Sequence, residues 1–176
     1  LDELDHLIDT SLTYARFERE APEPHFSSVR FADWLSDEVD AVRLLGRDLK
    51  ITVDTAKLPE NLAVDVDRKA MPYALRNLLR NAFKYASRQI VVSAELREPN
   101  ILVHVDDDGI GIPPEDRESV FSAFTRLDRS RDRATGGYGL GLAITRRVLE
   151  LHGGTAMAGT APLGGARFTL TWPLAQ

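Results

Sequence analysis

Residues 77–85 read NLLRNAFKY and place two asparagines, Asn77 and Asn81, four positions apart in an otherwise apolar segment. If the segment is a helix, this spacing puts both side chains on one face. Asparagine is a mediocre helix former, because its amide competes for backbone hydrogen bonds. Either the amides turn to solvent and their spacing is accidental, or their carbonyl oxygens hold a ligand. The rest of the chain has to decide between these interpretations.

The composition is that of one compact domain, with 176 residues of which 43 % are hydrophobic and 28 % charged. The net charge of −5 argues against nucleic-acid binding. The absence of cysteine excludes disulfides and thiolate zinc sites and favours a reducing compartment. The four histidines are scattered, and no apolar run approaches the ~18 to 20 residues needed to cross a bilayer. Because the chain starts at Leu1, in the middle of an apolar helical repeat, we expect it to be part of a longer protein.

Hydrophobic periodicity and turn residues predict the elements around this segment. The first helix carries Leu4, Ile8 and Leu12 on one stripe that needs a partner. Asp67 is a plausible N-cap for the helix that holds the asparagines. In chain order we predict a helix over 1–20, a linker over 21–29, a helix over 31–46, strands over 49–55 and 62–67, a helix over 68–86, a hairpin over 89–106, a long loop, a helix over 140–153 and a strand over 164–174. This order predicts an α/β sandwich in which one mixed sheet of about five strands has three helices on one face.

The sequence DDGIGI at 107–112 is a candidate ligand site. Gly109 and Gly111 lack side chains where the backbone must turn or approach a ligand closely. A carboxylate at Asp107 could accept a hydrogen bond from an exocyclic amine such as adenine N6, and a base without that donor would leave it unpaired. The alternative is a strand that ends in an acidic turn, with Asp106 and Asp108 as its solvated neighbours.

The sequence GGYGLGL at 136–142 opens the next predicted helix. Uncapped N–H groups at a helix N-terminus form a seat for phosphate, and glycines let the phosphate approach closely. The spacing matches neither G-x-x-x-x-G-K-[ST] nor G-x-G-x-x-G, so a flexible hinge is an alternative interpretation.

In this order and at these separations, NLLRNAFKY, DDGIGI, FSAF and GGYGLGL resemble the N, G1, F and G2 boxes of sensor histidine kinases. The ATP-binding domain of those kinases has the Bergerat fold of the GHKL superfamily, which includes gyrase, Hsp90 and MutL. The resemblance covers roughly residues 30–174, and the stretches RLDRSRDRATGG and GGARFTLTWPL are most similar to RstB-type sensor kinases. Residues 1–20 resemble the end of the second helix of the dimerisation and phosphotransfer domain.

The resemblance implies roles for the two asparagines. It gives Asn81 as a ligand of Mg²⁺, an ion that takes hard oxygen ligands from few protein groups together with nucleotide phosphates. Lys84 lies on the same helical face and can reach a phosphate, while Tyr85 is either a nucleotide-side aromatic or a core residue. Hydrolytic relatives have a glutamate as general base at the position of Asn77, and an amide cannot take a proton. This favours a kinase over an ATPase.

The resemblance also implies the rest of the site and a lid after the G1 box. Phe121 and Phe124 are expected to anchor this lid, and Arg126 to contact the phosphates or the partner helix. No catalytic side chain is expected on this chain. The expected nucleotide-binding residues are Asn77, Asn81, Lys84, Tyr85, Asp107, Gly109, Gly111, Ile112, Phe124, Arg126, Gly137, Gly139, Leu140, Gly141 and Leu142, with Asn81 as the metal ligand.

The implied cofactors are ATP and Mg²⁺, and the implied partners are the phosphotransfer domain of the same kinase and, through it, a response regulator. The acceptor histidine is missing, because DHLID around His6 lacks the Arg and Pro of the acceptor pattern. We expect a phosphotransfer-helix remnant at 1–20, a linker at 21–29 and the catalytic domain at 30–176. The parent is expected to be a homodimer in the bacterial inner membrane, with this domain on the cytoplasmic side and touching neither nucleic acid nor membrane. A nucleotide-sensing module with little phosphotransfer is the alternative, and Asn77 speaks against a gyrase-type hydrolase.

Overall fold

The computed structural model describes residues 2–20, 23–46, 48–123 and 140–176. Its centre is a five-stranded mixed sheet in the order β2-β4-β5-β7-β6, in which β2 runs parallel to β4 and all other neighbours are antiparallel. These strands are β2 (Lys50–Asp54), β4 (Gln89–Arg97), β5 (Asn100–Asp107), β6 (Thr155–Thr160) and β7 (Ala166–Pro173). The predicted mixed sheet is confirmed.

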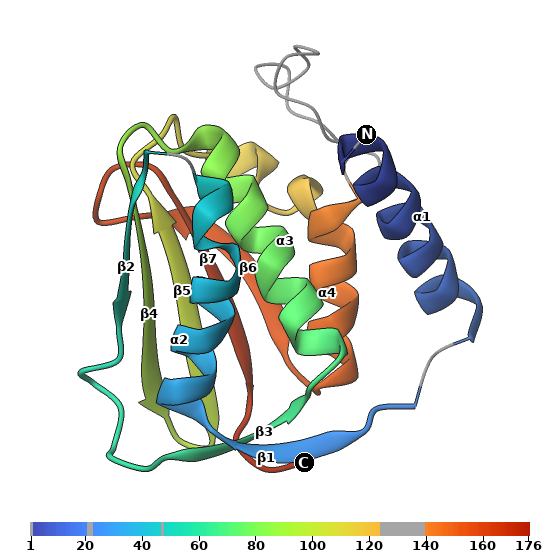
Figure 1. The fold of residues 1–176 in the computed structure, drawn as a ribbon, viewed down its shortest axis with the longest axis vertical. Helices are drawn as coiled ribbons and strands as arrows, with labels where there is room; N and C mark the ends of the chain where they lie inside the picture. The colour runs from blue at the N-terminus through green and yellow to red at the C-terminus, as the bar shows by residue number, and fades with distance from the viewer. Residues whose placement is uncertain (1, 21–22, 47, 124–139) are drawn as a thin grey trace.

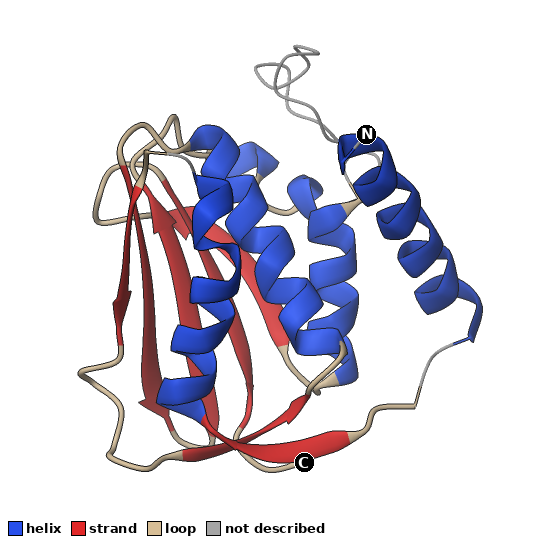
Figure 2. Ribbon diagram, in the orientation of Figure 1, coloured by secondary structure: helices blue, strands red, loops and turns tan. Residues whose placement is uncertain are grey.

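One face of the sheet is covered by α2 (Phe31–Val42), α3 (Ala70–Tyr85) and α4 (Gly141–Leu151), as Figures 1 and 2 show. The strands supply alternate apolar residues to this layer, such as Ile90, Val92 and Ala94 of β4, which are all buried. The predicted α/β sandwich with helices on one face is therefore confirmed. Short 3-10 helices occur at η1 (Arg43–Gly46), η2 (Pro114–Asp116) and η3 (Ser119–Phe121).

Two strands form a separate antiparallel ribbon, β1 (Phe26–Arg30) with β3 (Ala63–Asp67). Residues 26–29 of the segment predicted as a linker are therefore part of a strand. The sequence FSSVR has a weak strand pattern. Only Val29 of this strand is buried, and β1 owes its conformation to pairing with β3. The two strands predicted before α3, β2 and β3, lie in different sheets. The edge strand β6, TAMAGT, was not predicted.

The N-terminus of α3 has the predicted cap. Oδ1 of Asp67 accepts hydrogen bonds from the N–H groups of Lys69 at 2.9 Å and Ala70 at 3.0 Å. These N–H bonds, with one from His25, lower the pKa of Asp67 although its partial burial acts in the opposite direction. The helix α4 ends at Leu151, and Gly153, two residues later, has a φ of +71° that is strained for any residue with a Cβ.

His152 joins α4 to the ribbon. Its ring is fully buried, Nε2 accepts from the Asp67 N–H at 3.0 Å, and Nδ1 lies 2.8 Å from the carbonyl oxygen of Val148. Because Nε2 must accept, the proton sits on Nδ1 and the ring is neutral. Burial lowers the pKa of His152, although the Val148 carbonyl and the charge of Asp67 act to raise it.

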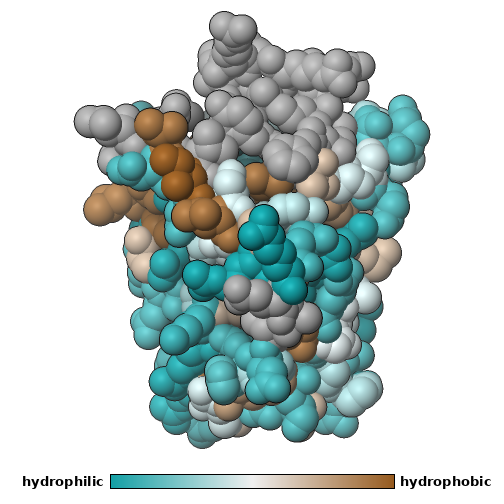
Figure 3. Space-filling view, turned by 90° about the vertical axis from the view of Figure 1, so that its right-hand side faces the viewer, coloured by the Kyte–Doolittle hydropathy of each residue, from teal (hydrophilic) through white to brown (hydrophobic). Residues whose placement is uncertain are grey.

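The first helix, α1 (Asp2–Glu20), packs outside the sandwich against α4. Tyr14 and Phe17 contact the core, and Glu18 forms an ion pair with Arg147 of α4. By contrast, Leu4, Ile8 and Leu12 are 56 %, 50 % and 64 % exposed. Figure 3 views the side that carries α1, and apolar surface gathers toward its upper left. Among the described residues, no helix combines the length and apolar content needed to cross a membrane.

Candidate functional site

The two asparagines of α3 differ in their surroundings. Asn77 is 6 % exposed, and its Nδ2 is buried with no hydrogen-bond partner in the described part of the chain. Its side chain lies beside the start of α4, where a Cβ on Gly141 would be 3.6 Å from Oδ1. Asn81, four residues further along, is half-buried. A buried amide without a partner costs free energy, so the interpretation that the amides turn to solvent is wrong for Asn77.

The N-terminus of α4 provides hydrogen-bond donors next to this amide. Leu140, at the N-cap position, is buried and makes no side-chain cap bond. The hydroxyl of Thr145 bonds to the carbonyl oxygens of Ala74 and Gly141, both at 3.1 Å, and so holds the first turn of α4 against α3. The unpaired N–H groups of a first helical turn attract anions. Together with Asn77 they form a donor-lined site that suits phosphate oxygens.

Asp107 ends β5 as a buried carboxylate, 2 % exposed. Its Oδ1 accepts from the N–H groups of Gly109 at 2.9 Å and Ala166 at 3.1 Å. Burial raises the pKa of Asp107, the two N–H bonds oppose this rise, and the charges of Asp108 and Asp106 add to it. Among the described residues no hydrogen bond ends on Oδ2, which leaves that oxygen as the acceptor for a ligand.

Two glycines allow the backbone to close around Asp107. A Cβ on Gly109 would lie 2.0 Å from the carbonyl oxygen of Tyr85, so any side chain would push this loop away from α3. A Cβ on Gly165 would lie 2.3 Å from Oδ1 of Asp107. Sequence reasoning found Gly109 but missed Gly165. The signal available was the GG pair at 164–165, directly before the last strand.

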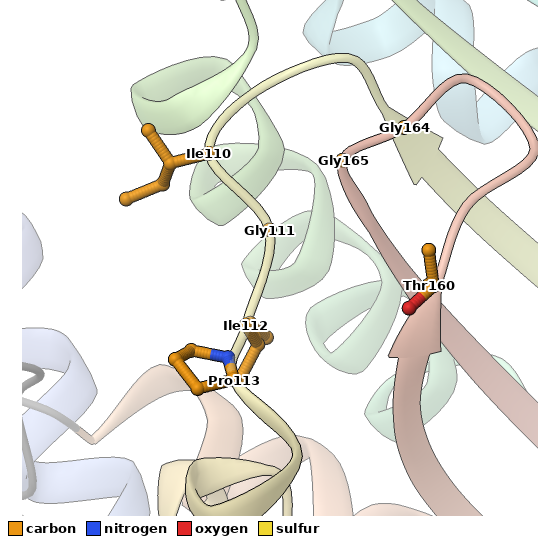
Figure 4. Close-up of a pocket in the computed structure, with 7 residues that line it drawn as sticks. All are labelled: Ile110, Gly111, Ile112, Pro113, Thr160, Gly164 and Gly165. Carbon is orange, nitrogen blue, oxygen red and sulfur yellow. The ribbon is translucent and has the colours of Figure 1, made fainter.

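A cavity of about 300 Å³ opens beside these glycines (Figure 4). The loop after β5 lines one side, and the turn between β6 and β7, with Thr160, lines the other. The predicted residues Gly111 and Ile112 line this cavity. Thr160 also lines it and was not predicted from the sequence. The lining residues are Ile110, Gly111, Ile112, Pro113, Thr160, Gly164 and Gly165.

Of the two carboxylates beside Asp107, which the alternative interpretation treated as solvated neighbours, Asp106 is buried and Asp108 stays partly exposed. Asp106 is 4 % exposed and forms a bidentate pair with Arg167, with Nε–Oδ1 at 2.7 Å and Nη2–Oδ2 at 2.8 Å. Asp108 accepts from the N–H groups of Ser87 at 2.8 Å and Arg88 at 3.1 Å, which lowers the pKa of Asp108. The expectation of a solvated side chain is therefore wrong for Asp106, because the strand end places it next to Arg167, a donor that is distant in sequence.

The remaining predicted residues fall into two groups. Lys84 is exposed and Tyr85 half-buried at the end of α3, while Leu140, Gly141 and Leu142 begin α4. Phe121 is buried, packs edge-on against Phe168, and carries the guanidinium of Arg146 over its ring at 4.6 Å. The predicted residues outside the described part of the chain are Phe124, Arg126, Gly137 and Gly139.

Comparison with known proteins gives one family. Residues 66–176 match the model of the histidine kinase-, DNA gyrase B- and HSP90-like ATPases. The sensor protein RstB of Escherichia coli K12 is 40 % identical over 174 residues, which are 99 % of this chain and 40 % of RstB. The sensor histidine kinase CpxA of the same strain is 45 % identical over 105 residues, or 60 % of this chain and 23 % of CpxA. The chain thus spans less than half the length of these relatives.

Solved structures agree with this comparison. Full-length ShkA in complex with AMPPNP superposes with a TM-score of 0.83 at 26 % identity, covering 99 % of this chain and 36 % of ShkA. The nucleotide-free catalytic domain of the histidine kinase ThkA superposes at 0.73 over 86 % of this chain and 99 % of that domain, and its 24 % identity supports the fold alone. The chain therefore belongs to the family of histidine kinase-, DNA gyrase B- and HSP90-like ATPases, and the relatives found for it are sensor kinases.

Proposed function

We propose that this chain is the ATP-binding catalytic part of a sensor histidine kinase, which donates the γ-phosphate of ATP to a histidine on a separate phosphotransfer domain. The observation that carries the proposal is the position of Asn77 beside the N-terminus of α4. In the described part of the chain, the buried amide nitrogen of Asn77 has no partner, its side chain lies beside the start of α4, and the N-cap residue Leu140 makes no cap bond. Phosphate oxygens would satisfy both. The structure of ShkA with AMPPNP, an adenine nucleotide analogue, supports ATP as the ligand.

The base of the nucleotide would lie in the cavity beside Gly111 and Gly165, with its exocyclic amine donating to Asp107. Because burial already raises the pKa of Asp107, a base without this donor would leave a costly unpaired carboxylate. Adenine presents an amine at this position, whereas guanine presents a carbonyl oxygen. The site is therefore expected to select ATP over GTP.

The residues present also fit Mg²⁺. In the described part of the chain, no three His, Cys, Asp or Glu side chains cluster closely enough to hold a metal by themselves. Asn81 would provide one neutral oxygen ligand and the nucleotide phosphates the others, which suits an ion that leans on few protein groups. When bound, Mg²⁺ would supply positive charge to the phosphate oxygens.

The chemistry needs no base from this chain. A neutral imidazole nitrogen of the acceptor would attack the γ-phosphorus, the bond to the β–γ bridging oxygen would break, and ADP would leave. Water, in contrast, must lose a proton as it attacks, and the amide of Asn77 cannot accept one. We therefore expect transfer to histidine and very slow hydrolysis.

We further propose that α1 is the end of the second helix of the phosphotransfer domain. Its exposed stripe of Leu4, Ile8 and Leu12 has the spacing of a helix–helix interface. In this proposal the parent is a homodimer in the bacterial inner membrane, with the catalytic domain on the cytoplasmic side. The histidine kinase ThkA has been solved in complex with the response regulator protein TrrA, and by analogy a response regulator would receive the phosphate here.

The test is to incubate the chain with γ-labelled ATP and Mg²⁺, alone and with the phosphotransfer domain of its parent. We expect ATP binding in both samples and acid-labile, base-stable label only when the acceptor domain is added. Labelling should be weak, because separation removes an effective concentration on the order of mM. Label on the isolated chain would place an acceptor within it. Intact ATP binding without label in either sample would favour a nucleotide-sensing module.

A further inference from the structure

The helix-free face of the sheet carries a charged pair next to the base-binding carboxylate. Asp106 of β5 and Arg167 of β7 are direct cross-strand partners. Both oxygens of Asp106 accept from the guanidinium, at 2.7 and 2.8 Å, and the carboxylate is almost fully buried. Two parallel charge-assisted bonds of this kind fix geometry as well as contribute energy. The pair therefore sets how β5 and β7 meet at this end of the sheet.

Each member of the pair is the sequence neighbour of a residue in the candidate site. Asp107 follows Asp106 and faces the helices, and Ala166 precedes Arg167 and donates its N–H to Oδ1 of Asp107 at 3.1 Å. Gly165 approaches the same oxygen so closely that a Cβ there would lie 2.3 Å away. A small slip between the strands would therefore break the Ala166 bond or press the turn into the carboxylate.

We infer that Asp106 and Arg167 are positioning residues for base recognition. They hold the strands in the register at which Ala166 occupies Oδ1 of Asp107, so that Oδ2 is left to accept from the exocyclic amine of the base. This inference rests on the proposed function, in which Asp107 reads adenine. It adds to that site a pair of side chains that lie on the opposite face of the sheet and contact no nucleotide.

The same pair also controls charge at the site. Asp107 accepts more strongly from the base when it is ionised, and the charges of Asp106 and Asp108 both act against its ionisation. The guanidinium of Arg167 offsets the charge of Asp106. Two other titratable groups face this pair: Glu95, whose charge acts on Arg167, and His104, whose pKa is lowered by burial and by Arg167. A neutral His104 leaves Arg167 as the cation that compensates Asp106.

The experiment measures the affinities of the 176-residue chain for Mg-ATP and Mg-GTP by calorimetry across a pH series. Arg167→Met removes the cation but keeps most of the side-chain length. It should raise the pH below which ATP binding is lost, because the charge of Asp106 then acts uncompensated against the ionisation of Asp107. At the acidic end of the pH series ATP binding should weaken by about tenfold. The ratio of ATP to GTP affinity should fall with it. Arg167→Lys, which keeps the charge without the bidentate geometry, should recover part of the loss.

A double variant separates charge compensation from a general loss of stability. In Asp106→Asn with Arg167→Met, the uncompensated carboxylate is gone, so the pH midpoint of ATP binding should return toward that of the wild type. The matched control is Thr169→Val, which removes the 2.8 Å contact between Thr169 and His104 further along the same strands. It should lower the melting temperature and leave both the pH midpoint and the ATP:GTP ratio unchanged.

The possible results distinguish this inference from the proposed function. If Arg167→Met keeps the wild-type pH midpoint and base preference, the inference is wrong while ATP binding by the wild type stands. If the double variant keeps the raised pH midpoint of Arg167→Met, the charge role of the pair is wrong. If the wild-type chain binds ATP no better than GTP, base reading by Asp107 is itself wrong, and the role of the pair falls with it.

Discussion

Replacing Gly165 by alanine should weaken ATP binding without unfolding the chain. The new Cβ would lie 2.3 Å from Oδ1 of Asp107, 2.4 Å from its carbonyl oxygen and 2.6 Å from the Gly109 nitrogen. Two of these atoms belong to backbone, so the turn before β7 has to move. Overpacking of this kind typically costs about 1–3 kcal/mol of folding free energy.

The movement would displace the Ala166 N–H from Asp107. A hydrogen bond to a charged group contributes about 1.5–3 kcal/mol, and this sets the upper limit of the effect on the carboxylate that reads the base. At about 1.4 kcal/mol per factor of ten, ATP affinity should fall by up to roughly ten- to 150-fold. The pH below which binding fails should also rise, because the Ala166 bond is one of the two that oppose the raised pKa of Asp107.

Two other glycines provide controls for this variant. Gly159→Ala, in β6, places its Cβ in open space and should change neither stability nor affinity. Gly154→Ala would bring its Cβ to 1.9 Å from the Thr171 carbonyl oxygen, at the other end of the sheet. It should lower stability but leave ATP affinity intact.

The assay is calorimetric titration with Mg-ATP, together with urea unfolding of each variant without nucleotide. Affinities are compared at a temperature at which all variants are folded. If Gly165→Ala binds ATP as tightly as Gly159→Ala does, the close approach of this turn to Asp107 has no role in binding, and the reasoning is refuted.

Three further predictions concern the phosphate end, the base and pH. Asn81→Ala should abolish the Mg²⁺-dependent part of ATP affinity, and Asn77→Ala should weaken that part less, as measured by titrations with and without Mg²⁺. Normal Mg-ATP binding by Asn81→Ala would show that Asn81 is not a metal ligand. Asp107→Asn should keep the fold, judged by circular dichroism, and lose most of its ATP affinity, and equal affinity would contradict its role. The pKa of His152 is lower in the folded chain than in the unfolded chain, so the unfolded chain binds more protons at acidic pH. The contribution of His152 to stability is therefore complete above about pH 6.5 and is lost as the pH falls toward the pKa of the folded state. The urea midpoint should therefore fall between about pH 7.5 and about pH 5, and the fall should persist in His104→Gln, because His104 contributes separately in the same direction; a constant midpoint would contradict the buried neutral ring.

Much of the fold could be read from residues that are close in the chain. The apolar repeat of α3, its cap at Asp67 and the alternation along β4 and β5 predicted those elements near their observed bounds. Gly109 and Asp107 could be placed at a ligand site for the same reason, since a glycine pair directly after an apolar strand is a local signal. The strands that were missed, β1 and β6, have weak local patterns and owe their conformation to a partner strand.

The sequence by itself therefore determined the local elements and the polar groups of the candidate site. Only the tertiary structure decided which distant groups meet: Ala166 with Asp107 across 59 residues, Arg167 with Asp106 across 61, and His152 with Asp67 across 85. Each of these contacts depends on strand order, register or helix docking, which are set by the packing of the whole core and not by the periodicity of any one segment. A shift of one residue in the pairing of β5 with β7 would leave the pattern of each strand unchanged and would separate every one of these β5–β7 partners.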